Sequence, residues 1–234
     1  MRAVPLIVAI VLISKAAFGV IHVAAGRSNA AINLQNEGQA LLEKGDYANA
    51  RKNLDEAIRL DPTLWPAYHN RAVLNMREHK LKAALQDATM ALRERGSFSQ
   101  SAILRAEINS KLGNYDAVLR ELKQVASLGS RGNAYPEALN GLAWFHATCP
   151  ESRCRNGQLA VTEAKRACSR SNYQKPGFLD TLAAAYAEMR DFDNAVRFEE
   201  KAMAIGASPE DMKAMREHLA SFKQHRPYRD TPER

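Results

Sequence analysis

The sequence predicts an all-α protein built from stacked helix hairpins, and three observations support this prediction. The 234 residues are 46% hydrophobic, with only 12 glycines and 9 prolines, a mixture that favours helix and allows a sizeable core. A spaced series of small and aromatic residues returns with a period of 34 residues. Within each period the apolar residues recur at helical spacing, so each period has helical faces to bury.

Residues 1–25 differ in character from everything that follows. A single arginine precedes an apolar run over residues 3–13, which has the length of the hydrophobic region of a signal peptide. The alternative is an uncleaved anchor over residues 4–25, about the length that a bilayer requires, with Lys15 near its middle. Cleavage and anchoring both remain open. Either one predicts an exported protein, periplasmic or anchored to the inner membrane.

The first period, residues 31–64, has the features of one helix hairpin. Gly38 lies on the apolar face of the first helix and lets a partner helix approach closely. Gly45 is a signal for the end of that helix and Asp46 is an N-cap for the next one. The second helix should stop before Pro62, because proline disfavours helix at the preceding residue. Its expected inward face consists of Tyr47, Ala50, Leu54 and Ala57.

Four further hairpins follow, because one hairpin cannot bury its own apolar face and must stack on another. The units are predicted at residues 65–98, 99–132, 136–175 and 176–209, and the fourth has a turn five residues longer than the first. Residues 210–225 read as a final capping helix with one apolar stripe. Residues 226–234 contain little apolar material and are predicted to form a basic, flexible tail. The series that defines the second and third units is Ala72, His79, Leu81, Ala84 and Ala91, and then Ala106, Gly113, Tyr115, Val118 and Val125.

The stretch "GQALLEKGDYANARKNLDEAIRLDP" resembles the tetratricopeptide repeat, and the resemblance extends over residues 31–209. It implies a right-handed α-solenoid of about five tetratricopeptide-like hairpins whose concave groove is lined mainly by the first helix of each unit. It implies no chemistry, because such repeats are generally interaction scaffolds. The later pattern "LAWxxATCP…LDTLAAAYAE" looks like the C-terminal half of many bacterial repeat proteins, which favours an exported or membrane-tethered bacterial member.

The register of the repeats predicts which side chains line the groove. These positions lie beside the packed positions on each first helix. They are mixed in charge, which suits an extended or helical peptide with a few apolar anchors. Trp144 is the expected hot spot, although a tryptophan buried in the hairpin core is an equally good interpretation. The candidates are Gln35, Gln39, His69, Met76, Arg77, Ile103, Glu107, Lys111, Asn140, Trp144, Asp180 and Glu188.

Cys149 and Cys154 lie in or beside the enlarged turn of the fourth hairpin. Only His146 lies near them in the sequence, so a four-ligand zinc site is not indicated. No base is positioned for a nucleophilic thiol either. Two interpretations remain open: a disulfide between Cys149 and Cys154, or a buried Cys149 beside a free Cys154. We expect no catalytic residue, no metal site and no cofactor.

The formal charge of +7 permits an anionic partner without requiring one. The first helices mix Glu43 and Glu107 with Arg77 and Lys111, whereas nucleic-acid binders usually present a basic stripe. The sequence therefore predicts a non-enzymatic scaffold that binds a protein or peptide segment. The alternative is a nucleic-acid-binding helical-repeat protein.

Overall fold

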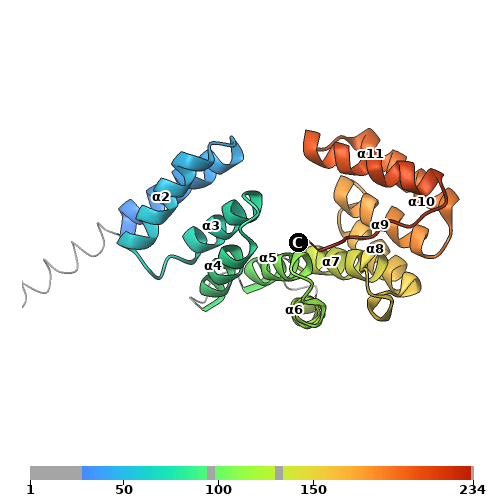
Figure 1. Cartoon of the computed structure of the whole chain (residues 1–234), viewed down its shortest axis with the longest axis horizontal. Helices are drawn as coiled ribbons and strands as arrows, with labels where there is room; N and C mark the ends of the chain where they lie inside the picture. Colours follow the sequence, from blue (N-terminus) through green and yellow to red (C-terminus); the bar gives the residue numbers. More distant parts are fainter. Residues whose placement is uncertain (1–27, 94–97, 130–133, 233–234) are drawn as a thin grey trace, which may run out of the picture. The chain divides into compact units, whose positions relative to one another are not determined.

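The structure is a computed structural model that describes residues 28–93, 98–129 and 134–232. These residues form helices and turns with no strand, which confirms the predicted all-α class (Figure 1). The chain divides into two compact units, residues 1–96 and residues 97–234. The predicted export segment, residues 1–25, lies outside the described residues. None of the described helices combines the length and the apolar character needed to cross a membrane.

The described residues of the first unit, 28–93, form two helix hairpins. A helix over residues 28–43 pairs with α2 (Tyr47–Leu60), and α3 (Trp65–Arg77) pairs with α4 (Leu81–Arg93). The predicted close approach is present, because a Cβ atom on Gly38 would lie 2.9 Å from Cγ of Leu54. A larger residue at Gly38 would therefore push α2 away. One cluster of the buried core consists of Ala50, Leu54, Ala57, Ala67 and Leu74.

In the first unit, the turn inside each described hairpin contains one residue with a positive φ. Gly45 has φ +79° and is followed by Asp46, whose Oδ1 accepts a hydrogen bond from the backbone N–H of Asn49 at 3.3 Å. Glycine adopts this conformation without steric cost, which explains the predicted helix end. His79, 34 residues later, has φ +57° in the same position of the next hairpin. This left-handed conformation is unfavourable for a residue with a Cβ atom.

The second unit contains three more hairpins and a final helix. The first helices of the hairpins, α5, α7 and α9, contact one another in succession, while α11 packs on α9 and α10. This succession of stacked hairpins confirms the predicted α-solenoid class with a C-terminal capping helix. The helices are α5 (Phe98–Lys111), α6 (Tyr115–Ser127), α7 (Tyr135–Thr148), α8 (Gly157–Arg170), α9 (Pro176–Glu188), α10 (Phe192–Ile205) and α11 (Pro209–Lys223).

Equivalent, partly buried ion pairs join the two helices of the second hairpin and the two helices of the third. Arg71 Nη2 lies 2.7 Å from Asp87 Oδ1 in the first unit, and Arg105 Nε lies 3.0 Å from Glu121 Oε1 in the second. In each pair the two partners are 16 residues apart in the sequence, and the second pair lies 34 residues, or one period, after the first. In each pair the carboxylate comes from the second helix of the hairpin and the guanidinium from the first. Such pairs favour one register between the helices, because a shift would leave a buried charge without its partner.

The C-terminal tail does not match the expectation of a flexible segment. Residues 226–232 follow α11 and return across the second unit. The backbone N–H of Asp230 donates to the carbonyl oxygen of Thr148 at 2.9 Å, and Arg229 Nη2 lies 2.6 Å from Glu188 Oε2. The ring of Tyr228 lies 4.3 Å from the ring of His218, centroid to centroid. One aromatic residue and two charges therefore hold a segment whose composition alone does not indicate packing.

Candidate functional site

A cleft of about 540 Å³ lies within the second unit. Its walls come from the successive first helices α5, α7 and α9, with contributions from α6, α11 and the C-terminal tail. The apolar part of the lining includes Ile103, Ala106, Val118, Leu122, Trp144, Phe145 and Phe178, and the polar part includes Glu107, Ser110, Lys111, Glu137, Asn140, Asp180, Thr181, Asp211 and Asp230. A cleft with an apolar floor and several polar groups is the usual form of a binding site.

The repeat register predicted a large part of this lining. Six of the predicted groove residues lie in the cleft, namely Ile103, Glu107, Lys111, Asn140, Trp144 and Asp180. The remaining candidate in the second unit, Glu188, is not part of the lining. Its carboxylate forms ion pairs with Arg155 at 3.0 Å and with Arg229 at 2.6 Å. Glu188 therefore links the enlarged turn to the C-terminal tail, and its part in binding a partner remains a prediction.

The other five candidates belong to the first unit, and the cleft contains none of them. Gln35 is buried, and Gln39 donates a hydrogen bond to Glu43 Oε1 at 3.1 Å. His69 is half-buried, and burial lowers the pKa of its imidazole. Met76 is half-buried and Arg77 is exposed. Their role in binding remains a prediction.

Trp144 lies in the cleft wall and is partly covered by the tail. Its indole Nε1 donates a hydrogen bond to Asp230 Oδ2 at 3.2 Å. Its ring lies 5.5 Å from the ring of His218 and 5.8 Å from the ring of Tyr228. One side of Trp144 thus packs in the core and the other side faces the cleft. This agrees in part with both interpretations drawn from the sequence, a groove residue and a core tryptophan.

The polar lining of the cleft is predominantly acidic. Five carboxylates, from Glu107, Glu137, Asp180, Asp211 and Asp230, contribute to the lining together with one cation, Lys111. Two acceptor atoms of the lining have no hydrogen-bond partner among the described residues: Oε2 of Glu137 and Oδ1 of Asn140. The sequence predicted a strip of mixed charge. Three of the acids, Glu107, Glu137 and Asp180, come from the first helices, and Glu137 Oε1 is paired with Lys175 Nζ at 2.6 Å. The excess is increased by Asp211 of α11 and Asp230 of the tail, which the register of the first helices does not include.

The cysteine turn has the character of a structural corner. Cys149 ends α7 and Cys154 lies in the short helix η2 (Ser152–Cys154). Both thiols are free and buried, and burial raises the pKa of Cys149 to about 12. Arg155 Nη1 donates to the carbonyl oxygens of Cys149 and Pro150 at 2.9 and 2.8 Å, which fixes the turn. A thiol with so high a pKa is a poor nucleophile at neutral pH. The structure represents the reduced state, so the disulfide remains a prediction.

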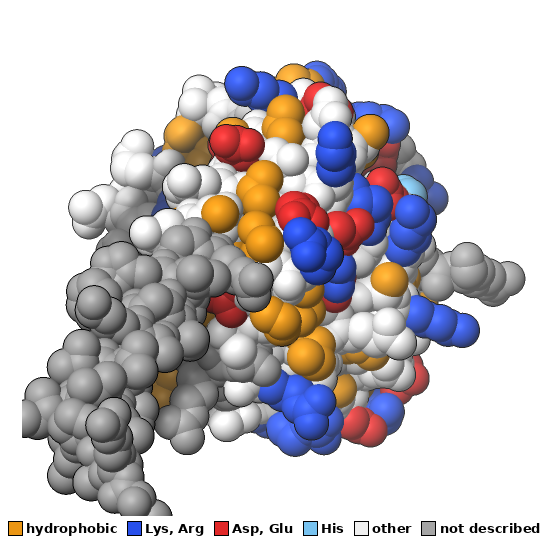
Figure 2. Space-filling view, turned by 90° about the vertical axis from the view of Figure 1, so that its left-hand side faces the viewer, with side chains coloured by type: hydrophobic (Ala, Val, Ile, Leu, Met, Phe, Trp, Pro, Cys, Tyr) orange, Lys and Arg blue, Asp and Glu red, His pale blue; other side chains and the backbone are white. Residues whose placement is uncertain are grey.

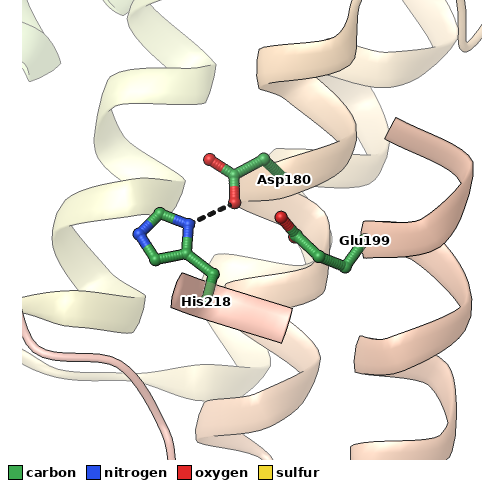
Figure 3. Close-up of side chains that lie close together, drawn as sticks. All are labelled: Asp180, Glu199 and His218. Carbon is green, nitrogen blue, oxygen red and sulfur yellow. Dashed lines mark hydrogen bonds and ion pairs between the residues drawn. The ribbon is translucent and has the colours of Figure 1, made fainter. Parts of the chain in front are cut away.

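Three ionisable residues that the sequence analysis did not bring together meet beside the cleft. They are Asp180 of α9, Glu199 of α10 and His218 of α11, and their side chains point toward one another (Figure 3). The carboxylate of Glu199 is fully buried, and neither of its oxygens has a hydrogen-bond partner among the described residues. Desolvation, followed by the nearby charge of Asp180, raises the pKa of Glu199 to about 10.

The repeat register contains a signal for this cluster. Leu54, Ala88 and Leu122 each lie 16 residues after the small residue of their first helix, and all three are in the core. In the fifth unit the same spacing after Ala183 leads to Glu199. A buried polar residue in a position that is otherwise apolar is more informative than any exposed one. A comparison of the repeats position by position would have revealed it.

Known proteins support the resemblance to the tetratricopeptide family. The family model described as TPR repeat matches residues 38–78. The tetratricopeptide repeat and J domain-containing co-chaperone DNJ1 of Cryptococcus neoformans is 34% identical over 114 residues, which are 49% of this chain and 21% of that protein. DnaJ homolog subfamily C member 3 of Homo sapiens is 30% identical over 105 residues, which are 45% of this chain and 21% of that protein. The chain spans about a fifth of the length of these relatives.

Solved structures agree on the fold. A chain of the APC/C hetero-tetramer Cut9–Hcn1 has a TM-score of 0.71 at 16% identity, with 88% of this chain and 40% of that chain covered. A thermophilic TPR protein of Thermus thermophilus has a TM-score of 0.66 at 19% identity, with 83% of this chain and 100% of that chain covered. At these identities the likeness establishes the fold alone.

Proposed function

We propose that this chain is a non-enzymatic interaction scaffold that binds a basic, partly apolar segment of a protein partner in the cleft of the second unit. The observation that carries the proposal is the composition of the cleft, in which five carboxylates and one lysine surround an apolar floor. Lysine and arginine side chains of a bound segment would complement these charges, and apolar side chains would contact Phe145 and Phe178. One of the relatives, DNJ1, is named a co-chaperone, which is consistent with a protein partner.

Two features of the lining favour a donor-bearing ligand in particular. Oε2 of Glu137 and Oδ1 of Asn140 are acceptors, so an ammonium, guanidinium or backbone N–H group could satisfy them. The side chains of an acidic segment would offer these atoms no donor and would add negative charge to the cleft. Buried acceptors without partners carry a free-energy cost of about 1–3 kcal/mol each, which a ligand of the right chemistry can recover.

The nucleic-acid alternative has less support. A phosphate backbone would meet the acidic lining of the cleft with repulsion. On the face shown in Figure 2, lysine and arginine side chains are interspersed with acidic ones and do not form a continuous basic stripe. A binding assay that includes a nucleic-acid probe tests this alternative directly.

The test uses fluorescent peptides of defined composition and measures anisotropy at several salt concentrations. One peptide alternates lysine with leucine, its counterpart alternates glutamate with leucine, and a single-stranded oligonucleotide is the third probe. We expect the lysine peptide to bind most tightly, with an affinity that falls as salt rises. The variant Glu107→Lys with Asp211→Lys should bind it at least tenfold more weakly.

The matched control is Asp193→Lys with Glu200→Lys, which changes two exposed acids of α10 outside the cleft. It should retain the wild-type affinity within about twofold, because distant surface charges are screened. Equal binding of the lysine and glutamate peptides, or equal losses in both variants, would contradict the cleft as the binding site. Tighter binding of the oligonucleotide would favour the alternative function.

We also propose that residues 1–25 carry the protein to or across the inner membrane, so that the solenoid works in the periplasm or beside the membrane. The support is the apolar run over residues 3–13. A periplasmic reporter fused after Asn33 should be active, and Ile7→Arg should abolish that activity by interrupting the run. A reporter that stays active with the arginine would disprove export by this segment.

A further inference from the structure

The group of Asp180, Glu199 and His218 has the geometry of a metal-ligand set. Each residue offers one ligand atom, and these atoms all lie within 4.8 Å of one another. Asp180 Oδ1 and His218 Nδ1 are 2.8 Å apart. Two atoms bound to one zinc ion at about 2.1 Å each lie no more than about 4.2 Å apart. Shifts of about half an ångström would therefore place all three atoms on one ion.

Glu199 is the residue that calls for an explanation. It is fully buried, and both of its oxygens lack a hydrogen-bond partner among the described residues. The neighbouring residue Asp180 is also acidic, and the side chain of Asp180 is only 14% exposed. Among the described residues, no lysine or arginine forms an ion pair with either carboxylate. Two adjacent carboxylates in a dry site require a neutralising partner, which can be a proton or a cation.

We propose that Asp180, Glu199 and His218 bind a divalent transition-metal ion, with zinc as the representative. Two carboxylates and a neutral imidazole balance the charge of such an ion, and this mixture of nitrogen and oxygen donors suits zinc. A shared proton would neutralise only one carboxylate, while His218 Nδ1 would keep its hydrogen bond to Asp180 Oδ1 at 2.8 Å. A metal ion would instead take one ligand atom from each of the three residues.

The surroundings of the three residues fit this role. Asp180 also lines the cleft, so an ion has a path from solvent and room for a water ligand. On the other side, the rings of Trp144 and Tyr228 lie 5.5 and 4.3 Å from the imidazole of His218 and form an apolar shell. The three ligands come from α9, α10 and α11, so a bound ion would tie the capping helix to the last hairpin. This inference does not depend on the peptide-binding proposal.

The experiment uses the full chain after removal of metal with a chelator and measures zinc binding by isothermal titration calorimetry and by thermal unfolding. We expect one zinc ion per chain and, at a hundredfold excess over the Kd, a rise in Tm of about 5–10 °C. Glu199→Gln keeps the size of the side chain and removes the charge, and it should weaken binding at least tenfold. Glu200→Gln, on the exposed side of the same helix, is the matched control and should bind like the wild type.

Cysteines are the other group that could bind the probe, so a second measurement separates them. The variant Cys149→Ser with Cys154→Ser should keep full zinc binding. Cobalt(II) bound to the wild type should show ligand-field absorption without a thiolate charge-transfer band, because no sulfur is among the proposed ligands. The absence of stoichiometric zinc binding by the wild type would overturn the proposal. Unchanged binding by Glu199→Gln would overturn it too, and would leave a proton shared between the two carboxylates as the explanation of the cluster.

Discussion

Replacement of Glu199 by leucine should stabilise the metal-free protein, although it changes a fully buried residue. The repeats provide the reason, since Leu54 and Leu122 occupy the equivalent position in the first and third hairpins. In these two hairpins the position therefore holds an apolar side chain of about the same size as glutamate, whereas the neighbours of Glu199 include Asp180 and His218. Replacing buried ionic groups by apolar residues of similar volume is often neutral or stabilising by about 1–4 kcal/mol.

The magnitude follows from three contributions. Burial raises the pKa of Glu199 to about 10 from the ordinary value of 4.5. Because an ordinary carboxyl is ionised at pH 7, keeping this one protonated costs about 3 kcal/mol. A fully buried leucine contributes a further 1.5–3 kcal/mol, roughly. Repacking around the branched side chain removes about 1–3 kcal/mol. We expect a net gain of about 2–4 kcal/mol in the free energy of unfolding of the second unit.

Urea unfolding with a chelator present measures this gain. Trp65→Phe leaves Trp144 as the single tryptophan of the chain, so its fluorescence reports on the second unit. The matched control, Glu200→Leu, replaces an exposed glutamate that is paired with Lys223 at 2.9 Å and should change stability by less than about 0.5 kcal/mol. A loss of stability in Glu199→Leu would show that the carboxylate has a partner in the metal-free protein, and the account of an unsatisfied charge would then be wrong.

Three further predictions test other parts of the structure. His79→Gly should raise the free energy of unfolding by about 1 kcal/mol, because φ is +57° at this position, and an unchanged urea midpoint would contradict the strain. The thiols of Cys149 and Cys154 should resist alkylation at pH 7.5 until the protein is unfolded, and rapid alkylation of the folded protein would contradict their burial. The double serine variant should bind the lysine peptide like the wild type. Removal of residues 226–234 should shift the emission of Trp144 to longer wavelength, because Asp230 and Tyr228 no longer cover it, and an unchanged spectrum would mean that the tail does not rest there in solution.

Part of the candidate site followed from the register of the repeats. Because every hairpin places its first helix on the same side of its unit, positions such as Asn140 and Asp180 could be assigned to the cleft from their spacing alone. Trp144 shows the limit of this reasoning. Its register indicated the groove, but its hydrogen bond to Asp230 spans 86 residues, and no local pattern encodes a contact at that separation.

The sequence by itself determined the all-α class, the helix hairpins and the order in which they follow one another. These features depend on interactions between residues close in the chain: the capping by Asp46, the helix end at Gly45 and the apolar faces at helical spacing. Only the tertiary structure decided the charge of the cleft, the course of the tail and the meeting of Asp180, Glu199 and His218. The physical reason is that these depend on how α9, α10, α11 and the tail pack against one another, and side chains from four separate segments have no common periodicity in the sequence.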